Sequence, residues 1–302
     1  MTPISESGLQ HAMVLLDGVL TRDPQFAPGL AARAEVRIGL ALLGHATPEG
    51  FQDAERDAHR ALTLQPGLVE ANAVLGITSA YRGEWPRAAA LFRSILAAHA
   101  DQAGVRAEYA TFVLQSAGHS AQALDELVQA YRDDPSNPSI LALLAAEESL
   151  LNRPEEARKF ADLASDSGYP STTPPLLQIL SGTAALAKPS RRAAARRALL
   201  ALVNELDLQK LDIGTHQQFI CWLVQLGALE SAYSVANATL DQLAREGGVG
   251  NTWGILWSPQ MRAFRLDSRF GSLVNRLRLR DDWDRNGPPD RCTLRKGEIT
   301  CA

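Results

Sequence analysis

The sequence predicts an all-α protein, a solenoid of antiparallel helix pairs with a short C-terminal cap that ends in a small β-hairpin. Three observations predict this fold. A pattern of small and bulky residues returns about every 34 residues through the first half of the 302-residue chain. Aromatic residues make up only 6%, which disfavours a β-sandwich or barrel, and apolar residues, at 46%, are numerous enough for a folded core.

The repeat is visible in several columns that keep one period. The steps of 34, 35 and 34 residues join Phe51, Trp85, Ser120 and Pro154; then Ala54, Ala88, Ala123 and Ala157; and then Ala58, Phe92, Leu127 and Ala161. Gly83, Gly118 and Asn152 each stand two residues before a member of the first column. So many columns with one period indicate repeated units of one local structure.

Each unit is predicted to be a helix, a tight turn and a second helix. In the best-preserved unit, apolar residues recur at helical spacing over 71–82, and Gly83 can end that helix in a left-handed conformation. A second helix is expected from about Pro86 to Ala98. Pro66 and Pro135 end helices of neighbouring units, because proline cannot continue the hydrogen-bond ladder.

These residues resemble the tetratricopeptide repeat (TPR), whose pattern is matched by Leu75-Gly76, Gly83, Trp85, Ala88 and Phe92. The resemblance covers about residues 9–169, with an opening half-unit of Ala12, Leu16 and Pro24, and it implies TPR-like repeats over residues 1–169. One turn near 44–50 is expected to be longer than the others, because Pro24 and Pro66 lie 42 residues apart.

The second half is also predicted to be helical, but it is less regular. A break at 168–175 separates the repeats from a divergent continuation over 170–247, with helices expected at about 176–186, 190–206, 215–226 and 229–245. Glycines at 247, 248 and 250 open a capping region over 248–302. Within it, Ser258-Pro259 is expected to start a short helix and Asp267 to cap another.

The C-terminal run from Asp267 to Leu277, followed by Trp283, Gly287 and Cys292, resembles the tail found after the repeat domains of bacterial winged-helix transcriptional regulators. That resemblance implies a noncatalytic sensor or interaction domain. This chain departs from such regulators because its sequence contains no winged helix and no apolar stretch long enough to span a membrane. The alternatives are a free-standing TPR adaptor and, less favoured, an enzyme with an unrecognised site.

Catalytic, metal and cofactor motifs are not found. The six histidines are scattered without metal-binding spacing, and the glycines near 248–254 lack the third glycine and the preceding strand of a dinucleotide loop. A net charge of −4 disfavours direct nucleic-acid binding. Four arginines (Arg191, Arg192, Arg196 and Arg197) spread around one helix and are read as a solvated surface. We therefore expect a chain without enzymatic activity or cofactor.

The resemblance places the binding surface on the first helix of each unit, which lines the concave groove of a TPR solenoid. The residues carried over by alignment are Glu35, Ile38, Glu70, Ile77, Tyr81, Glu108, Phe112, Gln115, Ser139 and Ser149. Acids, apolar residues and amides replace the Lys, Asn and Arg with which chaperone-binding repeats hold a C-terminal carboxylate. The groove is therefore expected to take a protein or peptide segment, neutral or basic, or a small cationic ligand, with Tyr81 and Phe112 as anchors; alternatively, these residues only solvate it.

The ten residues from Cys292 to Cys301 predict a disulfide-closed hairpin. With Lys296-Gly297 as a two-residue turn, counting outward places Cys292 opposite Cys301, at a separation of about 4.5 Å between Cα atoms that a disulfide tolerates. Two reduced cysteines in a frayed tail are the alternative. Cys221, in an apolar run, is expected to stay a free buried thiol. The bond would favour a periplasmic domain whose export signal lies outside the chain; otherwise a cytoplasmic location is expected.

Overall fold

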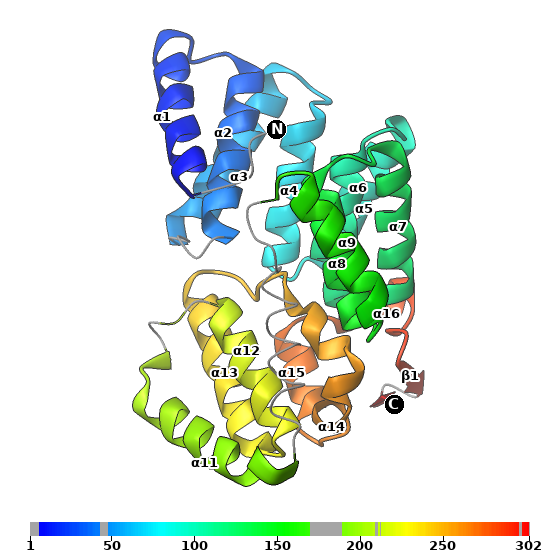
Figure 1. Ribbon diagram of the computed structural model, residues 1–302. Coiled ribbons are helices and arrows are strands. Elements are labelled where there is room, and N and C mark those ends of the chain that lie inside the picture. The colour runs from blue at the N-terminus through cyan, green and yellow to red at the C-terminus, as the bar shows by residue number, and fades with distance from the viewer. Residues whose placement is uncertain are drawn as a thin grey trace.

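The computed structural model describes residues 6–42, 48–169, 189–208, 211, 213–295 and 298–301. Figure 1 shows an all-α architecture in which helices α1–α9 form the upper part and helices α11–α15 the lower part, with α16 beside the lower ends of the upper helices. The upper part contains α1 (Glu6–Arg22), α2 (Ala27–Leu40), α3 (Pro48–Leu64), α4 (Val69–Tyr81), α5 (Trp85–Ala98), α6 (Ala103–Tyr109), η2 (Ala110–Gln115), α7 (Ser120–Asp133), α8 (Pro138–Leu150) and α9 (Pro154–Asp166).

These helices form antiparallel pairs, which confirms the predicted fold class. The pairs are α2 with α3, α4 with α5, α6–η2 with α7, and α8 with α9, and the first helices of successive pairs also contact one another. The repeated alanine column lies in the core: Ala54, Ala88 and Ala123 are 0% exposed and Ala157 is 1% exposed. A small residue at this position lets the paired helices approach closely.

The turn inside each pair uses the left-handed backbone conformation that the sequence predicts. Gly83, Gly118 and Asn152 occupy the same position of successive pairs, and their φ angles are 74°, 90° and 62°. Glycine adopts this conformation without strain, and asparagine tolerates it better than most residues. The three turns therefore share one geometry, and the period of the sequence reflects it.

The single step of 35 residues has a structural cause in the third pair. The first helix of this pair is one residue longer than its equivalents, since Ala103 lies 15 residues before Gly118 whereas Val69 lies 14 residues before Gly83. The extra residue is absorbed by η2, a π-helical stretch over Ala110–Gln115. A π-helix accommodates one inserted residue inside an α-helix without changing its ends.

The lower part begins with α11 (Pro189–Glu205), α12 (Ile213–Gln225) and α13 (Leu229–Arg245). Helices α12 and α13 form an antiparallel pair whose turn contains Gly227 at φ 74°. The helix expected at 176–186 lies outside the described residues. Cys221 is a buried free thiol, as expected, and burial raises its pKa to about 12.

The chain continues through a compact C-terminal segment. Its elements are η4 (Trp253–Trp257), η5 (Pro259–Met261), α14 (Arg262–Arg265), α15 (Phe270–Arg276), α16 (Arg280–Asn286), β1 (Cys292–Arg295) and β2 (Glu298–Cys301). The two strands pair antiparallel with Cys292 opposite Cys301, and a disulfide joins these cysteines. The predicted hairpin register and disulfide are therefore confirmed. Within the described ranges, no helix is both long and apolar enough to cross a membrane.

Candidate functional site

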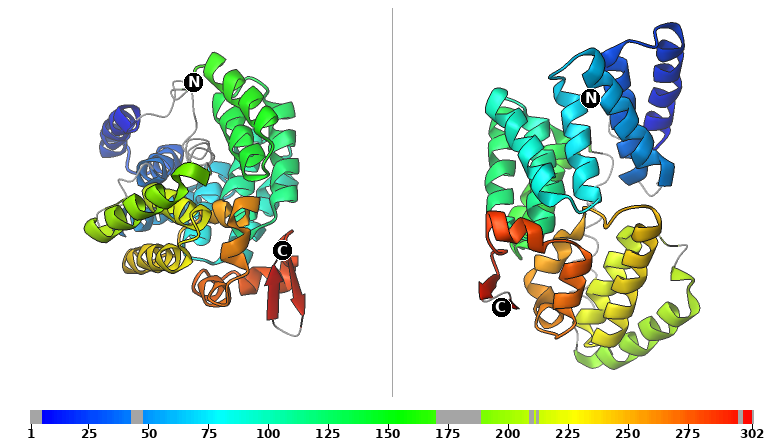
Figure 2. Two further views of the ribbon diagram at one scale, coloured as in Figure 1. Left: turned by 60° about the horizontal axis from the view of Figure 1, so that its bottom comes forward. Right: turned by 180° about the vertical axis from the view of Figure 1, so that it is seen from behind.

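The C-terminal segment packs along the turns inside the second and third helix pairs. We call these turns, Tyr81–Trp85 and Ser116–Ser120, the turn edge. Figure 2 shows, from behind, α16 lying under α5 and α7. The covering residues run from Glu246 to Asp290, 165 or more positions along the chain from some of the residues they contact.

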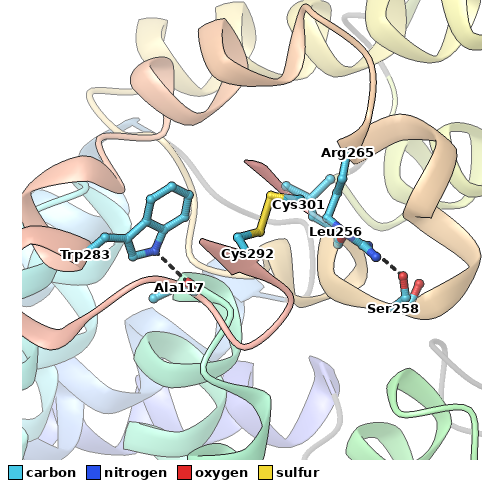
Figure 3. Close-up of a disulfide and its surroundings, with 7 residues drawn as sticks. All are labelled: Ala117, Leu256, Ser258, Arg265, Trp283, Cys292 and Cys301. Carbon is cyan, nitrogen blue, oxygen red and sulfur yellow. Dashed lines mark hydrogen bonds between the residues drawn. A yellow bond between two sulfur atoms is a disulfide. The ribbon is translucent and has the colours of Figure 1, made fainter. Parts of the chain in front are cut away.

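Backbone carbonyls of the turn edge accept most of the hydrogen bonds. The carbonyl of Tyr81 accepts from the backbone N–H groups of Val249 and Gly250, at 2.7 and 3.1 Å. The Ser116 carbonyl accepts from the indole N–H group of Trp257 at 3.0 Å. The Ala117 carbonyl accepts from the indole N–H group of Trp283 at 2.9 Å (Figure 3). The last carbonyls of a helix have no partner within the helix. The C-terminal segment satisfies them while excluding water.

Close contact at Gly118 fixes how near this segment can come. A Cβ atom at Gly118 would lie 2.4 Å from Cβ of Pro289 and 2.8 Å from the ring of Trp257. The backbone N–H of Asp290 donates to the Gly118 carbonyl at 3.0 Å, and its carboxylate accepts from the N–H of Ala121 at 2.7 Å. Glycine is therefore needed at this turn for its space as well as for its φ angle.

Five of the ten residues expected in the groove lie inside the protein: Ile38, Ile77, Tyr81, Gln115 and Ser149, which are 3–8% exposed. Tyr81 stacks on Phe51 with ring centroids 3.8 Å apart, and its hydroxyl donates to Glu246 at 3.1 Å. Burial and the Glu246 carboxylate raise the pKa of Tyr81. This residue therefore joins the two parts of the fold, and its ring is not available as a surface anchor.

Gln115 is also used within the fold. Its side-chain amide donates to the carboxylate of Glu147, and it packs against the backbone of Gly254 in the C-terminal segment. Glu147 is 0% exposed, and burial raises its pKa to about 7. The alignment did not single out Glu147. Glu147 and its neighbour Glu148 interrupt the largely apolar helix α8, and this interruption is the sequence signal that could have drawn attention to Glu147.

The other five expected residues remain at least partly exposed, and we call them the inner face. They lie on the first helices of the four pairs: Glu35 on α2, Glu70 on α4, Glu108 on α6, Phe112 on η2 and Ser139 on α8. Phe112 packs against the core with one side while part of its ring stays accessible. The inner face therefore combines three carboxyl groups, an aromatic ring and a hydroxyl.

Two of these carboxyl groups have strongly raised pKa values. Desolvation, with a smaller effect of Glu35, raises the pKa of Glu108 to about 8. Glu35 is exposed to water yet surrounded by protein on several sides, and desolvation together with the Glu70 carboxylate raises its pKa to about 7. Ionising these two carboxyl groups on the inner face therefore costs free energy.

A hollow lies between the hairpin and helices α14 and α15. Its volume is about 520 Å³, and its walls include Arg265, Phe270, Arg280 and Cys301. Arg265 donates to the carbonyls of Leu256 and Ser258, at 2.6 and 2.7 Å, and it is 3% exposed (Figure 3). Burial and the neighbouring Arg291 and Arg262 lower its pKa to about 10. Arg265 thus has a structural role in holding η4 and η5.

No group of three or more His, Cys, Asp or Glu side chains is arranged to hold a metal ion in the part of the chain that the structure describes.

The stacked antiparallel pairs, their repeated turns and the face formed by their first helices define the class of this protein: a TPR-like α-solenoid. No protein-family profile and no curated protein matches the sequence.

Among solved structures, similar chains include YrrB, described as a TPR protein with an unusual peptide-binding site, which is 16% identical over 53% of this chain and 78% of its own, with a TM-score of 0.34. MamA is 17% identical over 54% of this chain and 90% of its own, with a TM-score of 0.36. A MamA RS-1 double mutant is 15% identical over 53% of this chain and 85% of its own, with a TM-score of 0.36.

Proposed function

We propose that this protein is a noncatalytic binding protein that holds a protein or peptide segment on its inner face. The observation that carries the proposal is that one of two surfaces is covered within the protein and the other is accessible. The turn edge is covered by the chain's own C-terminal segment, whereas Glu35, Glu70 and Phe112 on the first helices of three pairs remain accessible. A partly exposed aromatic ring bordered by polar groups is typical of an anchor site.

A peptide library displayed on phage tests this proposal. Peptides selected on the full chain should bind Phe112→Ala about 10- to 100-fold more weakly, which corresponds to ~1–3 kcal/mol, because aromatic anchors dominate such interfaces. The matched control is Leu163→Ala. Leu163 lies on α9, the second helix of its pair, and is 37% exposed. If the selected peptides bind both variants equally weakly, or bind both as tightly as the wild type, the binding surface does not lie at Phe112.

As the biological setting, we propose the sensor or interaction part of a bacterial transcriptional regulator. The run from Asp267 to Leu277, with Trp283 and Cys292 after it, supports this setting, since it resembles the tail of such regulators. The genomic reading frame upstream of Met1 tests it. A winged helix followed by a membrane segment would support the regulator, whereas an in-frame stop codon directly before Met1 would support a free-standing adaptor.

A further inference from the structure

Glu35 and Glu108 form an unusual pair of acids on the inner face. They lie on α2 and α6, which belong to different helix pairs with α4 between them, yet, after desolvation, the charge of Glu35 is what raises the pKa of Glu108. Helix α4 contacts both α2 and α6, so the three helices that carry these carboxyl groups are packed side by side. Glu70, on the intervening α4, acts in turn on Glu35.

The second observation concerns the Oε2 atom of Glu108. This atom is fully buried and has no hydrogen-bond partner among the described residues. A buried carboxyl oxygen without a partner is costly, and most such atoms in proteins have one. The nearest arginine in sequence does not meet this need, because Arg106 donates to Glu126 at 2.6 Å and to the carbonyl of Ala100 at 2.9 Å.

Another acid of the solenoid, Asp57, has cationic partners of the kind that Glu35 and Glu108 lack in the described part of the chain. Asp57, which is 9% exposed, receives hydrogen bonds from Arg33 at 2.7 and 2.8 Å and from Arg37 at 3.3 Å. Within the described ranges, the charged groups that shift the pKa values of Glu35 and Glu108 are carboxylates only. The pair therefore lacks the cation that accompanies Asp57.

We propose that the inner face carries a seat for one positively charged group, an ammonium or a guanidinium, between Glu35 and Glu108. The inference rests on the proposed function and deepens it, because it specifies the chemistry of the ligand. Phe112 follows Glu108 by four residues and offers an apolar wall along which the methylene stem of a lysine or arginine can pack. The cationic group could belong to a basic peptide or to a small organic amine.

Proton release gives this seat a signature of its own. Near neutral pH the pair retains part of its protons, because desolvation opposes the ionisation of both carboxyl groups, with smaller effects of the Glu70 charge on Glu35 and of the Glu35 charge on Glu108. A bound cation favours the ionised carboxylates, so protons leave as the ligand binds. A cation that binds to ordinary surface carboxylates, already ionised at this pH, releases none.

The experiment is titration calorimetry of the full chain at pH 7 in two buffers of different ionisation enthalpy. The probes are the capped peptide acetyl-Ala-Ala-Lys-Ala-Ala-amide, its counterpart with Gln in place of Lys, and n-butylammonium chloride. We expect the Lys peptide to bind at least tenfold more tightly than the Gln peptide and to release protons. Displacement of the peptide by n-butylammonium would show that a small amine suffices; no displacement would assign the seat to a peptide side chain.

Glu35→Gln and Glu108→Gln should each weaken the binding of the Lys peptide at least tenfold and reduce proton release. Glu155→Gln, on the outer helix α9 and exposed, is the matched control and should leave both unchanged. Glu35→Gln is the decisive variant, since its exposed side chain can change without disturbing the fold. Equal binding of the Lys and Gln peptides, or no binding of either cationic probe, would overturn the seat. If library-selected peptides still depend on Phe112 but not on Glu35, the proposed function stands and only the seat fails.

Discussion

The indole N–H of Trp283 donates a hydrogen bond of 2.9 Å to the backbone carbonyl of Ala117, although 166 residues separate the two. Trp257 makes the same kind of bond to Ser116, and Trp85 to Leu277, at 3.0 and 2.8 Å. Buried indoles usually find an acceptor for their N–H group. Here the acceptors are carbonyls across the turn edge, so each tryptophan both fills the interface and fixes its register.

Replacing Trp283 by Phe should destabilise the protein by ~1–3 kcal/mol, because the Ala117 carbonyl then loses its partner in a buried environment. Urea unfolding followed by circular dichroism measures this loss. Trp222→Phe is the control, since the Trp222 indole nitrogen is buried without a hydrogen-bond partner in the described structure. A loss for Trp283→Phe no larger than that for Trp222→Phe would mean that the bond contributes little.

Gly118→Ala should cost more stability than Gly67→Ala. The two glycines have nearly the same φ angle, 90° and 88°, so the backbone strain of an added Cβ is similar, about 1 kcal/mol. A Cβ at Gly67 meets nothing within 4 Å, whereas at Gly118 it would collide with Pro289 and Trp257. Thermal unfolding of both variants isolates the contact with the C-terminal segment. Equal melting temperatures would show that the C-terminal segment shifts to accommodate the added Cβ at little energetic cost.

Thiol counting on denatured, unreduced protein should find one free thiol, Cys221, when the protein is purified under oxidising conditions. Replacing Cys292 and Cys301 by Ser should then lower stability by roughly 2–3 kcal/mol on the chain-entropy model for so short a loop. Reduction of the wild type should reproduce the effect of the double variant. Three free thiols in the oxidised preparation would remove the argument for an oxidising compartment.

Stability should fall as pH rises from about 4.5 to about 8, and Glu108→Gln should weaken this trend. The folded-state pKa of Glu108 is raised to about 8, so over this window the folded protein keeps a proton that the unfolded chain releases. At pH 8.5 the free energy of unfolding of the variant should exceed that of the wild type by ~1.4 kcal/mol or more, which is the energy equivalent of one pKa unit. At pH 5 the two free energies of unfolding should be nearly equal.

Urea unfolding at both pH values measures this difference. Glu205→Gln, at an exposed position of α11, serves as the control and should follow the wild type at both. A constant difference between Glu108→Gln and wild type across the pH range would indicate a change of packing and not of ionisation.

The parts of the fold that repeat locally could be predicted from the sequence. The alanine column, the left-handed turn residues and the helix limits all follow from periodicity, because each depends on contacts within one pair or between neighbours. The register of the hairpin could be counted outward from its turn, since strand pairing alternates regularly. Even the irregular step of 35 residues has a local cause, the π-helical stretch that includes Phe112.

The docking of the C-terminal segment could not be predicted in the same way. Helical periodicity shows which face of a helix is apolar, but it does not show which distant element will cover that face. Tyr81 therefore looked like a groove residue, although Glu246 and Gly248 enclose it. Three tryptophans in the last sixth of the chain were the available signal, because each buried indole needs an acceptor.

The covered turn edge also bears on how the chain reaches its native state. The helix pairs depend on contacts close in sequence, which favours rapid formation, whereas the bonds from Trp283 to Ala117 and from Val249 to Tyr81 join residues more than 160 positions apart. During synthesis the pairs leave the ribosome first, with the carbonyls of the turn edge still hydrated. The native contacts of the turn edge form only when the C-terminal segment has emerged. Until then the turn edge is the uncovered surface by which a nascent chain can associate prematurely with other chains.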